Sequence, residues 1–467
     1  MAKDSQPRER ALKIINSVLE EGKLSHIVLK QQLDEMEAGA DSGQRTADRQ
    51  KAFVTRLAMG TIEKMITLDY VINLFSKTKT EKMKPFIRGL LRMSVYQLLF
   101  MDSVPDSAAC NEAVKLAKAH RFTNLSPFVN GVLRNIARQK EGIVYPDSRK
   151  EDYTALSVRY SVPVWIIKKW EASYGREAML AMLASLGRMS SKTCLRINTS
   201  LAAKEEVLRL LQEECGEEKL ESASFAANVV TLNGGNVSNL TAFQKGYVQV
   251  QDVSSVLAGQ ISGVKEGAFC MDLCASPGGK TCHLADLQRG TGMVLAGDIS
   301  QEKIGLIKEN LARCGFENVQ LRVWDAMQPD ERYFGKADLV LADVPCSGLG
   351  VLRNKPDIRY RLKEEDIDKL AAMARKILTC AVQYLKEGGT LLFSTCTVTR
   401  EENEENRRWL LEHFALEPVD ITENLSEALL AVGNNRKTAR EGYLQLMITD
   451  DYDGFFLSKM IYGKGKS

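Results

Sequence analysis

A regular alternation of short apolar runs and helical stretches from Gly267 onward constrains the fold of this chain more than any other feature. Apolar runs such as "GMVLAGDIS" are followed by amphipathic stretches such as "QEKIGLIKENLARCG". Buried parallel strands read as continuous apolar runs, and helices connect them across the faces of the sheet. The pattern therefore predicts a doubly wound α/β domain of the Rossmann-like kind, in which ligands bind at the carboxyl ends of the strands.

The rest of the chain predicts two further domains. A chain of 467 residues exceeds the size of a single core, which stops growing near roughly 250 to 300 residues. Residues 8–139 place apolar side chains at three- and four-residue steps, which is typical of an all-α domain. We therefore expect a helical domain over 1–145, a small α+β domain over 146–250, and the α/β domain over 251–467.

Positive charge is concentrated in the helical region. Residues 1–150 contain 25 Lys and Arg against 17 Asp and Glu, whereas the remainder contains 38 against 43. A basic module joined to a slightly acidic one indicates a polyanion-binding part attached to a part with another task. A solvated helical face explains the charge alone equally well.

Cysteine usage and the start of the chain predict a cytoplasmic protein with reduced thiols. No apolar run approaches the length of a membrane span, and the first residues lack a signal-peptide pattern. The ten cysteines are irregularly spaced, which does not indicate a disulfide framework. Cys270, Cys274, Cys282 and His283 cluster without the knuckle spacing of zinc sites, so we expect no metal.

Acidic residues end four of the apolar runs, at Asp272, Asp298, Asp325 and Asp343. After the first of them, "SPGGK" lets the backbone approach a ligand and opens a helix with free N–H groups. One acidic strand end often only caps a helix, but four in register outline a pocket for a ribose and an adenine, which S-adenosyl-L-methionine fits. The candidate cofactor-binding residues are Cys274, Ala275, Ser276, Pro277, Gly278, Gly279, Lys280, Asp298, Asp325 and Asp343.

The motifs "DLCASPGGKT", "GDIS", "DVPCSGLGVLRNKPDIR" and "STCTVTREENE" resemble, in order and spacing, those of the RNA (cytosine-5) methyltransferases. Residues 1–140 resemble the NusB-type helical RNA-binding domain, especially in "KPFIRGLLRMSVYQLLFMDSVP". The combination is similar to bacterial enzymes that modify one cytosine of small-subunit ribosomal RNA. The resemblance implies methylation of carbon 5 of a cytosine, expected to be cytosine 967 of 16S ribosomal RNA. The RNA would be free or partly assembled into a subunit, and we expect a monomer.

The family pattern implies roles for two cysteines that follow apolar runs. Carbon 5 of cytosine is a poor nucleophile until a thiolate adds to carbon 6, and a second ionisable group then helps to release the product. By resemblance, Cys396 is the nucleophile and Cys346 assists release, whereas most cysteines at such positions are small buried hydrophobes. Asp343 would hold the pyrimidine at N3, and Lys280 would orient Asp343 or bind phosphate.

Candidate RNA contacts come from two regions. The basic helical module offers side chains for phosphates, and "VLRNKPDIRYR" after Cys346 offers arginines near the pocket mouth, with plain surface charge as the alternative for both. These candidates are Lys115, Lys118, Arg121, Arg134, Arg138, Arg353 and Arg359. Two other functions remain open: the same chemistry on large-subunit or transfer RNA, and a non-catalytic ribosome-assembly or antitermination factor.

Overall fold

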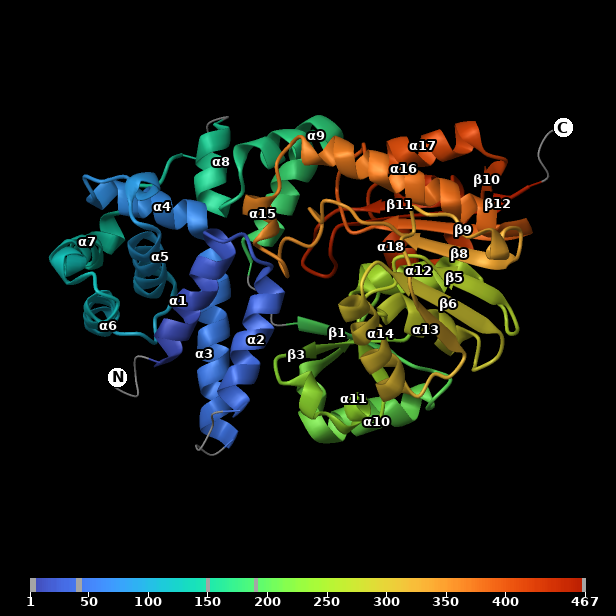
Figure 1. Cartoon of the computed structure of the whole chain (residues 1–467), viewed down its shortest axis with the longest axis horizontal. Helices are drawn as coiled ribbons and strands as arrows, with labels where there is room; N and C mark the ends of the chain where they lie inside the picture. The colour runs from blue at the N-terminus through green and yellow to red at the C-terminus, as the bar shows by residue number, and fades with distance from the viewer. Residues whose placement is uncertain (1–5, 39–43, 148–151, 189–191, 464–467) are drawn as a thin grey trace. The chain divides into compact units, whose positions relative to one another are not determined.

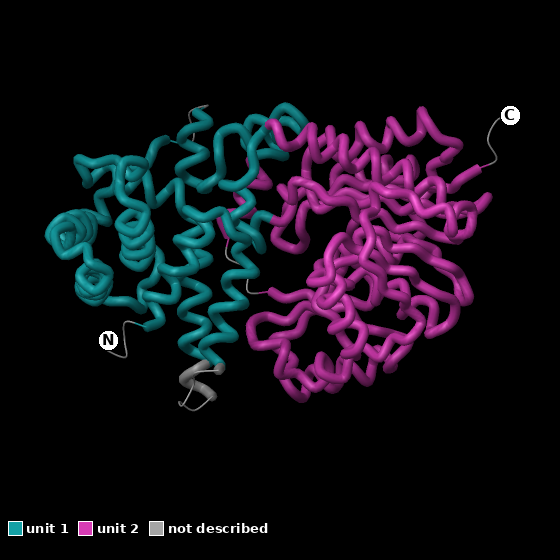
Figure 2. The backbone as a smooth tube through the Cα atoms, in the orientation of Figure 1, with its two compact units in different colours: residues 1–179, 352–364 teal, residues 180–351, 365–467 magenta. Residues whose placement is uncertain are grey.

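The computed structural model describes residues 6–38, 44–147, 152–188 and 192–463. The chain divides into two compact units, shown in Figure 2. Unit 1 comprises residues 1–179 with 352–364, and unit 2 comprises 180–351 with 365–467. This grouping differs from the three expected domains, because most of the α+β region joins the α/β domain and a short later segment belongs to the helical unit.

Unit 1 is built from helices, as the apolar spacing predicts. In α1 (Gln6–Leu19), Leu12 and Ile15 are buried against Leu57, Leu90 and other apolar residues of a large core in this unit. The other helices of the unit are α2 (Ser25–Ala38), α3 (Gln44–Glu63), α4 (Met65–Phe75), α5 (Pro85–Phe100), α6 (Asp106–Ala119), α7 (Ser126–Gln139), α8 (Tyr153–Tyr160), most of α9 (Val164–Leu186) and α15 (Ile358–Arg361).

Residues 352–364, which contain α15, pack into unit 1 although they follow the Cys346 motif in sequence. Arg359 is 1 % exposed and donates hydrogen bonds to the backbone carbonyls of Glu63 at 3.3 Å and Ser161 at 3.1 Å. The Tyr360 hydroxyl donates to the same Glu63 carbonyl at 2.9 Å. These side chains fix the segment within the helical unit.

Unit 2 contains a mixed sheet of eight strands in the order β10-β12-β9-β8-β5-β6-β7, with β11 paired to β12 (Figure 1). From β5 the chain runs outward through β6 and β7, and then crosses to β8 and β9 on the other side of β5. These five strands are parallel, whereas β12 is antiparallel to β9. Ligand sites of such sheets lie where the strand order reverses, here between β5 and β8.

The strands are β5 (Phe269–Asp272), β6 (Met293–Asp298), β7 (Val319–Val323), β8 (Ala337–Asp343), β9 (Leu385–Thr395), β10 (Leu416–Pro418), β11 (Tyr443–Leu446) and β12 (Phe455–Tyr462). Successive residues face opposite sides of the sheet. Cys270 belongs to the core under α12 (Val253–Ser262) and α13 (Gly279–Leu287), whereas Met271 belongs to the core under α16 (Asp366–Tyr384) and α17 (Glu404–His413). The helix α14 (Gln301–Cys314) packs beside α13. The predicted α/β architecture is confirmed, with antiparallel strands added at one edge.

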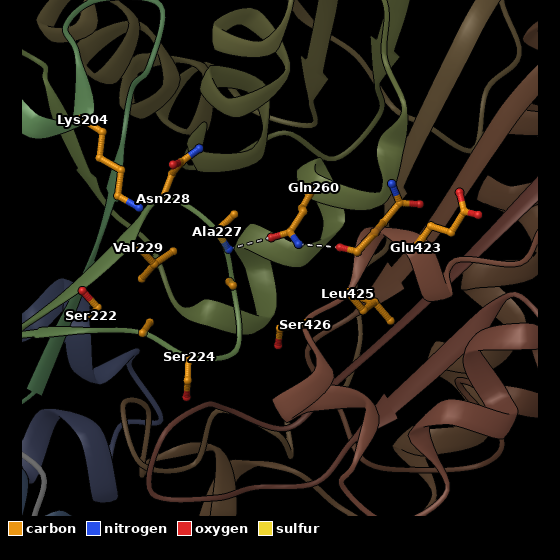
Figure 3. Close-up of a pocket in the computed structure, with 13 residues that line it drawn as sticks. Lys204, Ser222, Ser224, Ala227, Asn228, Val229, Gln260, Glu423, Leu425 and Ser426 are labelled. Atoms are coloured by element: carbon orange, nitrogen blue, oxygen red, sulfur yellow. Dashed lines mark hydrogen bonds between the residues drawn. The ribbon is translucent and has the colours of Figure 1, made fainter.

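A smaller antiparallel sheet in unit 2 has the order β2-β3-β1-β4. Its core combines Leu195 and Val230 with Val207 of the covering helix. Its elements are β1 (Lys192–Ile197), β2 (Leu220–Ser222), β3 (Val229–Asn233), β4 (Val248–Val250), α10 (Lys204–Cys215) and α11 (Thr241–Gln244). A cavity of about 400 Å³ beside this sheet, bounded by Gln260 and residues 423–426, contains none of the candidate site residues (Figure 3).

Unit 2 also contains the short α-helices α18 (Glu427–Leu430) and α19 (Asn435–Arg440). No helix among the described residues is long and apolar enough to span a membrane.

Candidate active site

The glycine turn after β5 needs glycine at one position for two reasons. Gly278 has φ +106°, a left-handed conformation that side chains disfavour. A Cβ atom at Gly278 would also lie 3.1 Å from the Ile307 side chain of α14. The turn therefore packs tightly against α14, and α13 begins at the next residue, where its first N–H groups have no carbonyl partners within the helix.

Asp272 ends β5 and is buried with an unusual ionisation. The Thr281 hydroxyl donates a 2.7 Å hydrogen bond to Oδ2, while Oδ1 has no hydrogen-bond partner among the described residues. Burial raises the pKa of Asp272 to about 7, although the Thr281 hydrogen bond works in the opposite direction. Asp272 therefore titrates near neutral pH at the edge of a cavity.

Two cavities meet at these strand ends. One of about 180 Å³ is lined by Gln251, Asp272 and Lys280 among others, and one of about 210 Å³ is lined by Asp298 and Asp325 among others. Both include Asp343. The candidate turn residues Cys274, Ala275, Ser276, Pro277, Gly279 and Lys280 all line one cavity or both.

The larger cavity combines carboxylates with an apolar wall. The Asp298 carboxylate accepts hydrogen bonds from the N–H groups of Ser276 at 3.0 Å and Ile299 at 2.8 Å, and forms an ion pair with Lys303 at 3.0 Å. Asp325 lies two residues beyond β7 and accepts from the Met327 N–H at 3.0 Å. The apolar lining comes from Leu273, Trp324, Met327, Met373 and Ile377.

This arrangement fits S-adenosyl-L-methionine. Carboxylates can accept hydrogen bonds from ribose hydroxyls, and the apolar wall suits an adenine face. In the smaller cavity, Oδ1 of buried Asp272 and Nε2 of buried Gln251 lack partners among the described residues. An acceptor and a donor left unpaired in a buried wall match a small molecule that carries both kinds of group.

The Lys280–Asp343 pair stands at the junction of the two cavities. Lys280 Nζ lies 2.7 Å from Asp343 Oδ2, and the Ser394 hydroxyl donates to Asp343 Oδ1 at 2.7 Å. The Lys280 side chain is only 15 % exposed. Burial lowers the pKa of Lys280, but the charge and hydrogen bond of Asp343 outweigh it, so the pKa is raised overall. The ammonium therefore stays charged and orients the carboxylate.

The two candidate thiols are adjacent. Cys346 follows β8, Cys396 follows β9 directly, and their Sγ atoms lie 3.4 Å apart. The pKa of the Cys346 thiol is raised well above its usual value, first by its hydrogen bond with Cys396 and then by burial. Cys346 therefore keeps its proton at neutral pH. The parallel pairing of β8 with β9 brings these residues, fifty apart in sequence, to one edge of the sheet.

Polar residues that have no role in the sequence predictions lie in the loops that carry the thiols. Ser347, Thr397 and Glu402 are buried, and the Ser347 hydroxyl is hydrogen-bonded to the other two. They fall inside the quoted motifs, but nothing in their spacing distinguishes them from loop residues. Gln251 and Lys303 line the cavities, but their spacing in the sequence likewise does not distinguish them from other polar residues.

The candidate RNA contacts divide into two groups. Five are exposed on α6, α7 and the connection between them: Lys115, Lys118, Arg121, Arg134 and Arg138. Arg353 is half-buried in the segment 352–364. Arg359 was expected near the pocket mouth, but its buried guanidinium is used by backbone carbonyls of unit 1, so it is not a surface contact for RNA.

The sheet order and the acidic strand ends define a Rossmann-like, S-adenosylmethionine-dependent methyltransferase. Residues 260–461 match the family model "16S rRNA methyltransferase RsmB/F", and residues 5–138 match the "NusB family" model. With the relatives described next, these matches show that the chain belongs to the ribosomal RNA small subunit methyltransferase B family.

Relatives match over most of their length. The chain is 35 % identical to the probable ribosomal RNA small subunit methyltransferase B of Bacillus subtilis, over 89 % of this chain and 91 % of that protein. It is 30 % identical to the Escherichia coli ribosomal RNA small subunit methyltransferase B, over 99 % and 100 %. This chain is therefore a ribosomal RNA methyltransferase.

Solved structures share the fold. PH0851 aligns with a TM-score of 0.78 and 24 % identity, covering 97 % of this chain and 98 % of that one. The NSun6 protein of Pyrococcus horikoshii, solved with SFG, aligns with a TM-score of 0.56 and 20 % identity, covering 65 % and 99 %. Both similarities support the Rossmann-like architecture expected from the sequence.

Proposed function

We propose that this chain transfers a methyl group from S-adenosyl-L-methionine to carbon 5 of one cytosine, cytosine 967, in small-subunit 16S ribosomal RNA. The reaction passes through a covalent bond between Cys396 and the RNA. The observation that carries the proposal is the pair of thiols 3.4 Å apart. Cys346 follows β8 and Cys396 follows β9. At the same ends of these strands, Ser394 of β9 donates a hydrogen bond to Asp343 of β8, which lines both cavities.

The chemistry requires one thiolate and one retained proton. The Cys396 thiolate adds to carbon 6 of cytosine, and the resulting enamine-like ring is nucleophilic at carbon 5. When bound, S-adenosyl-L-methionine supplies an electrophilic methyl group and leaves as S-adenosylhomocysteine. The proton on carbon 5 then passes to solvent while the bond between carbon 6 and Cys396 Sγ breaks, which restores the thiolate and leaves 5-methylcytosine.

Cys346 and Asp343 support the two halves of this reaction. A Cys346 thiol that keeps its proton can donate a hydrogen bond to the departing Cys396 thiolate 3.4 Å away, which assists release. Asp343, oriented by Lys280 and Ser394, would accept a hydrogen bond from N3 once that nitrogen has taken a proton from solvent as the thiolate adds, and N3 gives this proton back when the thiolate leaves. The cofactor candidates Asp298 and Asp325 would hold the ribose and adenine in the larger cavity.

The target base must leave its stack, since carbons 5 and 6 are out of reach in a stacked helix. The exposed cations of α6 and α7 would hold phosphates of the same RNA. A ribosomal RNA substrate, free or partly assembled, implies a cytoplasmic location. One chain carries every proposed catalytic group, so we propose a monomer.

The test is methyl transfer from labelled S-adenosylmethionine to unmodified small-subunit ribosomal RNA, with denaturing gels for protein–RNA adducts. The wild type should methylate, Cys396→Ala should show no transfer and no adduct, and Cys346→Ala should accumulate a stable adduct. Bisulfite mapping of the product should place the methyl group at the proposed cytosine.

Three results would each contradict a part of the proposal. Transfer by Cys396→Ala at the wild-type rate would exclude covalent catalysis through that residue, and an adduct formed by Cys396→Ala would exchange the roles of the two thiols. Methylation of large-subunit or transfer RNA in preference to small-subunit RNA would change the substrate and leave the chemistry intact.

A further inference from the structure

A buried carboxylate outside the predicted site joins the two cysteine loops. Glu402 is 1 % exposed, and its Oε1 accepts a hydrogen bond from the Ser347 N–H at 2.7 Å. Its Oε2 accepts from the hydroxyls of Ser347 at 2.6 Å and Thr399 at 2.8 Å. Ser347 directly follows Cys346, and Thr399 lies just after Cys396. One side chain thus holds the residues beside both thiols.

A second link reinforces the first. The Ser347 hydroxyl lies 2.6 Å from that of Thr397, the residue directly after Cys396. The backbone N–H of Gly350 also donates to the Cys396 carbonyl at 3.0 Å. Ser347 and Thr397 are buried, so these bonds form away from competing water. One hydrogen-bond network therefore links the two loops that carry the sulfurs.

The charge of Glu402 acts on the Cys346 thiol. Burial raises the pKa of Glu402, and its three hydrogen bonds work in the opposite direction. Among the causes that raise the pKa of Cys346, the charge of Glu402 follows the hydrogen bond to Cys396, burial and the charge of Cys396. A carboxylate at this place favours the protonated form of Cys346.

We propose that Glu402 is a positioning residue that holds the Cys346 thiol against Cys396 and thereby sets the rate at which the RNA adduct is released. The release role rests on the proposed covalent mechanism. The positioning role rests on geometry alone, so the two parts are measured separately.

Disulfide trapping measures the positioning role without RNA or cofactor. Diamide takes two hydrogens from a pair of thiols and links them only when their sulfurs meet. The rate of the Cys346–Cys396 cross-link is followed by mass spectrometry of alkylated peptides, with Cys346→Ala as the background. Glu402→Ala should slow this cross-link by about tenfold or more, because hydrogen bonds to a buried charge are lost from both loops.

Two control variants are matched to Glu402→Ala. One keeps the shape of the Glu402 side chain, and the other replaces a nearby glutamate that takes no part in the proposed network. Glu402→Gln keeps the side-chain shape, accepts from the Ser347 N–H and donates to the hydroxyls, so it should cross-link within about threefold of the wild type. Glu405 is exposed on the neighbouring helix α17, and Glu405→Ala should cross-link at the wild-type rate.

Adduct lifetime measures the release role. With RNA and cofactor, Glu402→Ala should still form the Cys396 adduct but release it about tenfold more slowly, while Glu402→Gln releases it nearly normally. General misfolding would instead prevent adduct formation. If Glu402→Ala does not fold, Ser347→Ala removes one of the same bonds and should slow cross-linking and release in the same direction.

Wild-type cross-linking rates in both Glu402→Ala and Ser347→Ala would overturn the positioning role. Normal release in variants that cross-link slowly would overturn the release role. A wild type that cross-links readily but forms no RNA adduct would contradict the covalent mechanism, and with it the release role. The cross-linking rates of the variants would still decide whether Glu402 positions the two thiols.

Discussion

Individual residues at the strand ends differ in ionisation because their partners differ. Lys280 and Asp272 are both largely buried, but only Lys280 has an opposite charge in contact, through Asp343. Asp272 has a neutral partner, the Thr281 hydroxyl. The paired ammonium therefore remains charged, whereas the pKa of the unpaired carboxyl rises to about 7.

The pKa of Asp272 predicts a pH-dependent loss of stability. Between the unfolded value of 3.8 and the folded value of about 7, only the folded state keeps the proton. Rising pH therefore destabilises the fold over this range, by about 1.4 kcal/mol for each pH unit at most. Asp272→Asn cannot ionise, so it should gain stability relative to the wild type as pH rises from 4 to 8. Thermal midpoints of both proteins across this range measure the trend.

A constant difference between the two thermal midpoints would contradict this ionisation. Thr281→Val is the companion variant, because it removes the hydrogen bond that lowers the pKa of Asp272. The pKa of Asp272 in folded Thr281→Val should therefore be higher than in the wild type. The stability of this variant should keep falling up to a higher pH than the stability of the wild type does.

At the scale of elements, the loops after β8 and β9 depend on a glycine where they meet β12. Gly454 donates its N–H to the Gly350 carbonyl at 3.0 Å. A Cβ atom at Gly350 would lie 1.9 Å from the Gly454 oxygen and 2.8 Å from the Cys396 oxygen. Backbone atoms cannot move aside as a flexible side chain can, so this crossing requires a residue without a Cβ atom.

Gly350→Ala should therefore destabilise unit 2 by about 1 to 3 kcal/mol, the usual effect of overpacking, and should slow adduct formation by displacing the Cys396 loop. Thermal unfolding and single-turnover adduct formation measure the two effects. Gly305, in α14, has nothing within 4 Å of a Cβ position, so Gly305→Ala is the matched control. It should be neutral or slightly stabilising. Equal behaviour of the two variants would contradict the close crossing.

Much of this element-level picture could be predicted from the sequence. Asp272, Asp298 and Asp343 are the last residues of their strands, as the apolar runs indicate. The antiparallel direction of β12 could not be predicted, because "FFLSKMIY" has the same apolar character in either direction. The network of Ser347 with Glu402 was equally hidden, since it depends on which loops the sheet brings together.

At the scale of the whole molecule, the exposed cations of α6 and α7 predict how RNA affinity depends on salt. Replacing Lys118, Arg134 and Arg138 together by alanine should weaken RNA binding and reduce the slope of log affinity against log salt by roughly 0.7 to 0.9 for each lost phosphate contact. Methyl transfer at saturating RNA should be unchanged, because these residues are far in sequence from the strand-end residues and lie in the other unit. Filter binding at several salt concentrations measures the slope.

Lys204→Ala with Arg209→Ala on α10 is the control, since both side chains are exposed cations of unit 2. If this control reduces the slope of log affinity against log salt by the same amount, the phosphate contacts are not specific to the helical unit.

The course of the chain between the units could not be predicted either. "VLRNKPDIRYR" follows Cys346, and this position predicts that Arg359 lies near the pocket mouth, within reach of RNA. Its charge is instead satisfied by carbonyls contributed by residues far away in sequence, Glu63 and Ser161. Spacing within a motif gives no information about such partners.

The helical unit is consequently not a detachable module. A shortened protein that starts after residue 179 would still carry residues 352–364, but without the carbonyls of Glu63 and Ser161 that receive Arg359. Arg359, in the segment that follows the Cys346 loop, would lose these two partners. Loss of activity in such a truncation would report damage to the remaining enzyme as much as loss of RNA binding, so the contribution of the helical unit is better measured by surface substitutions in the intact chain.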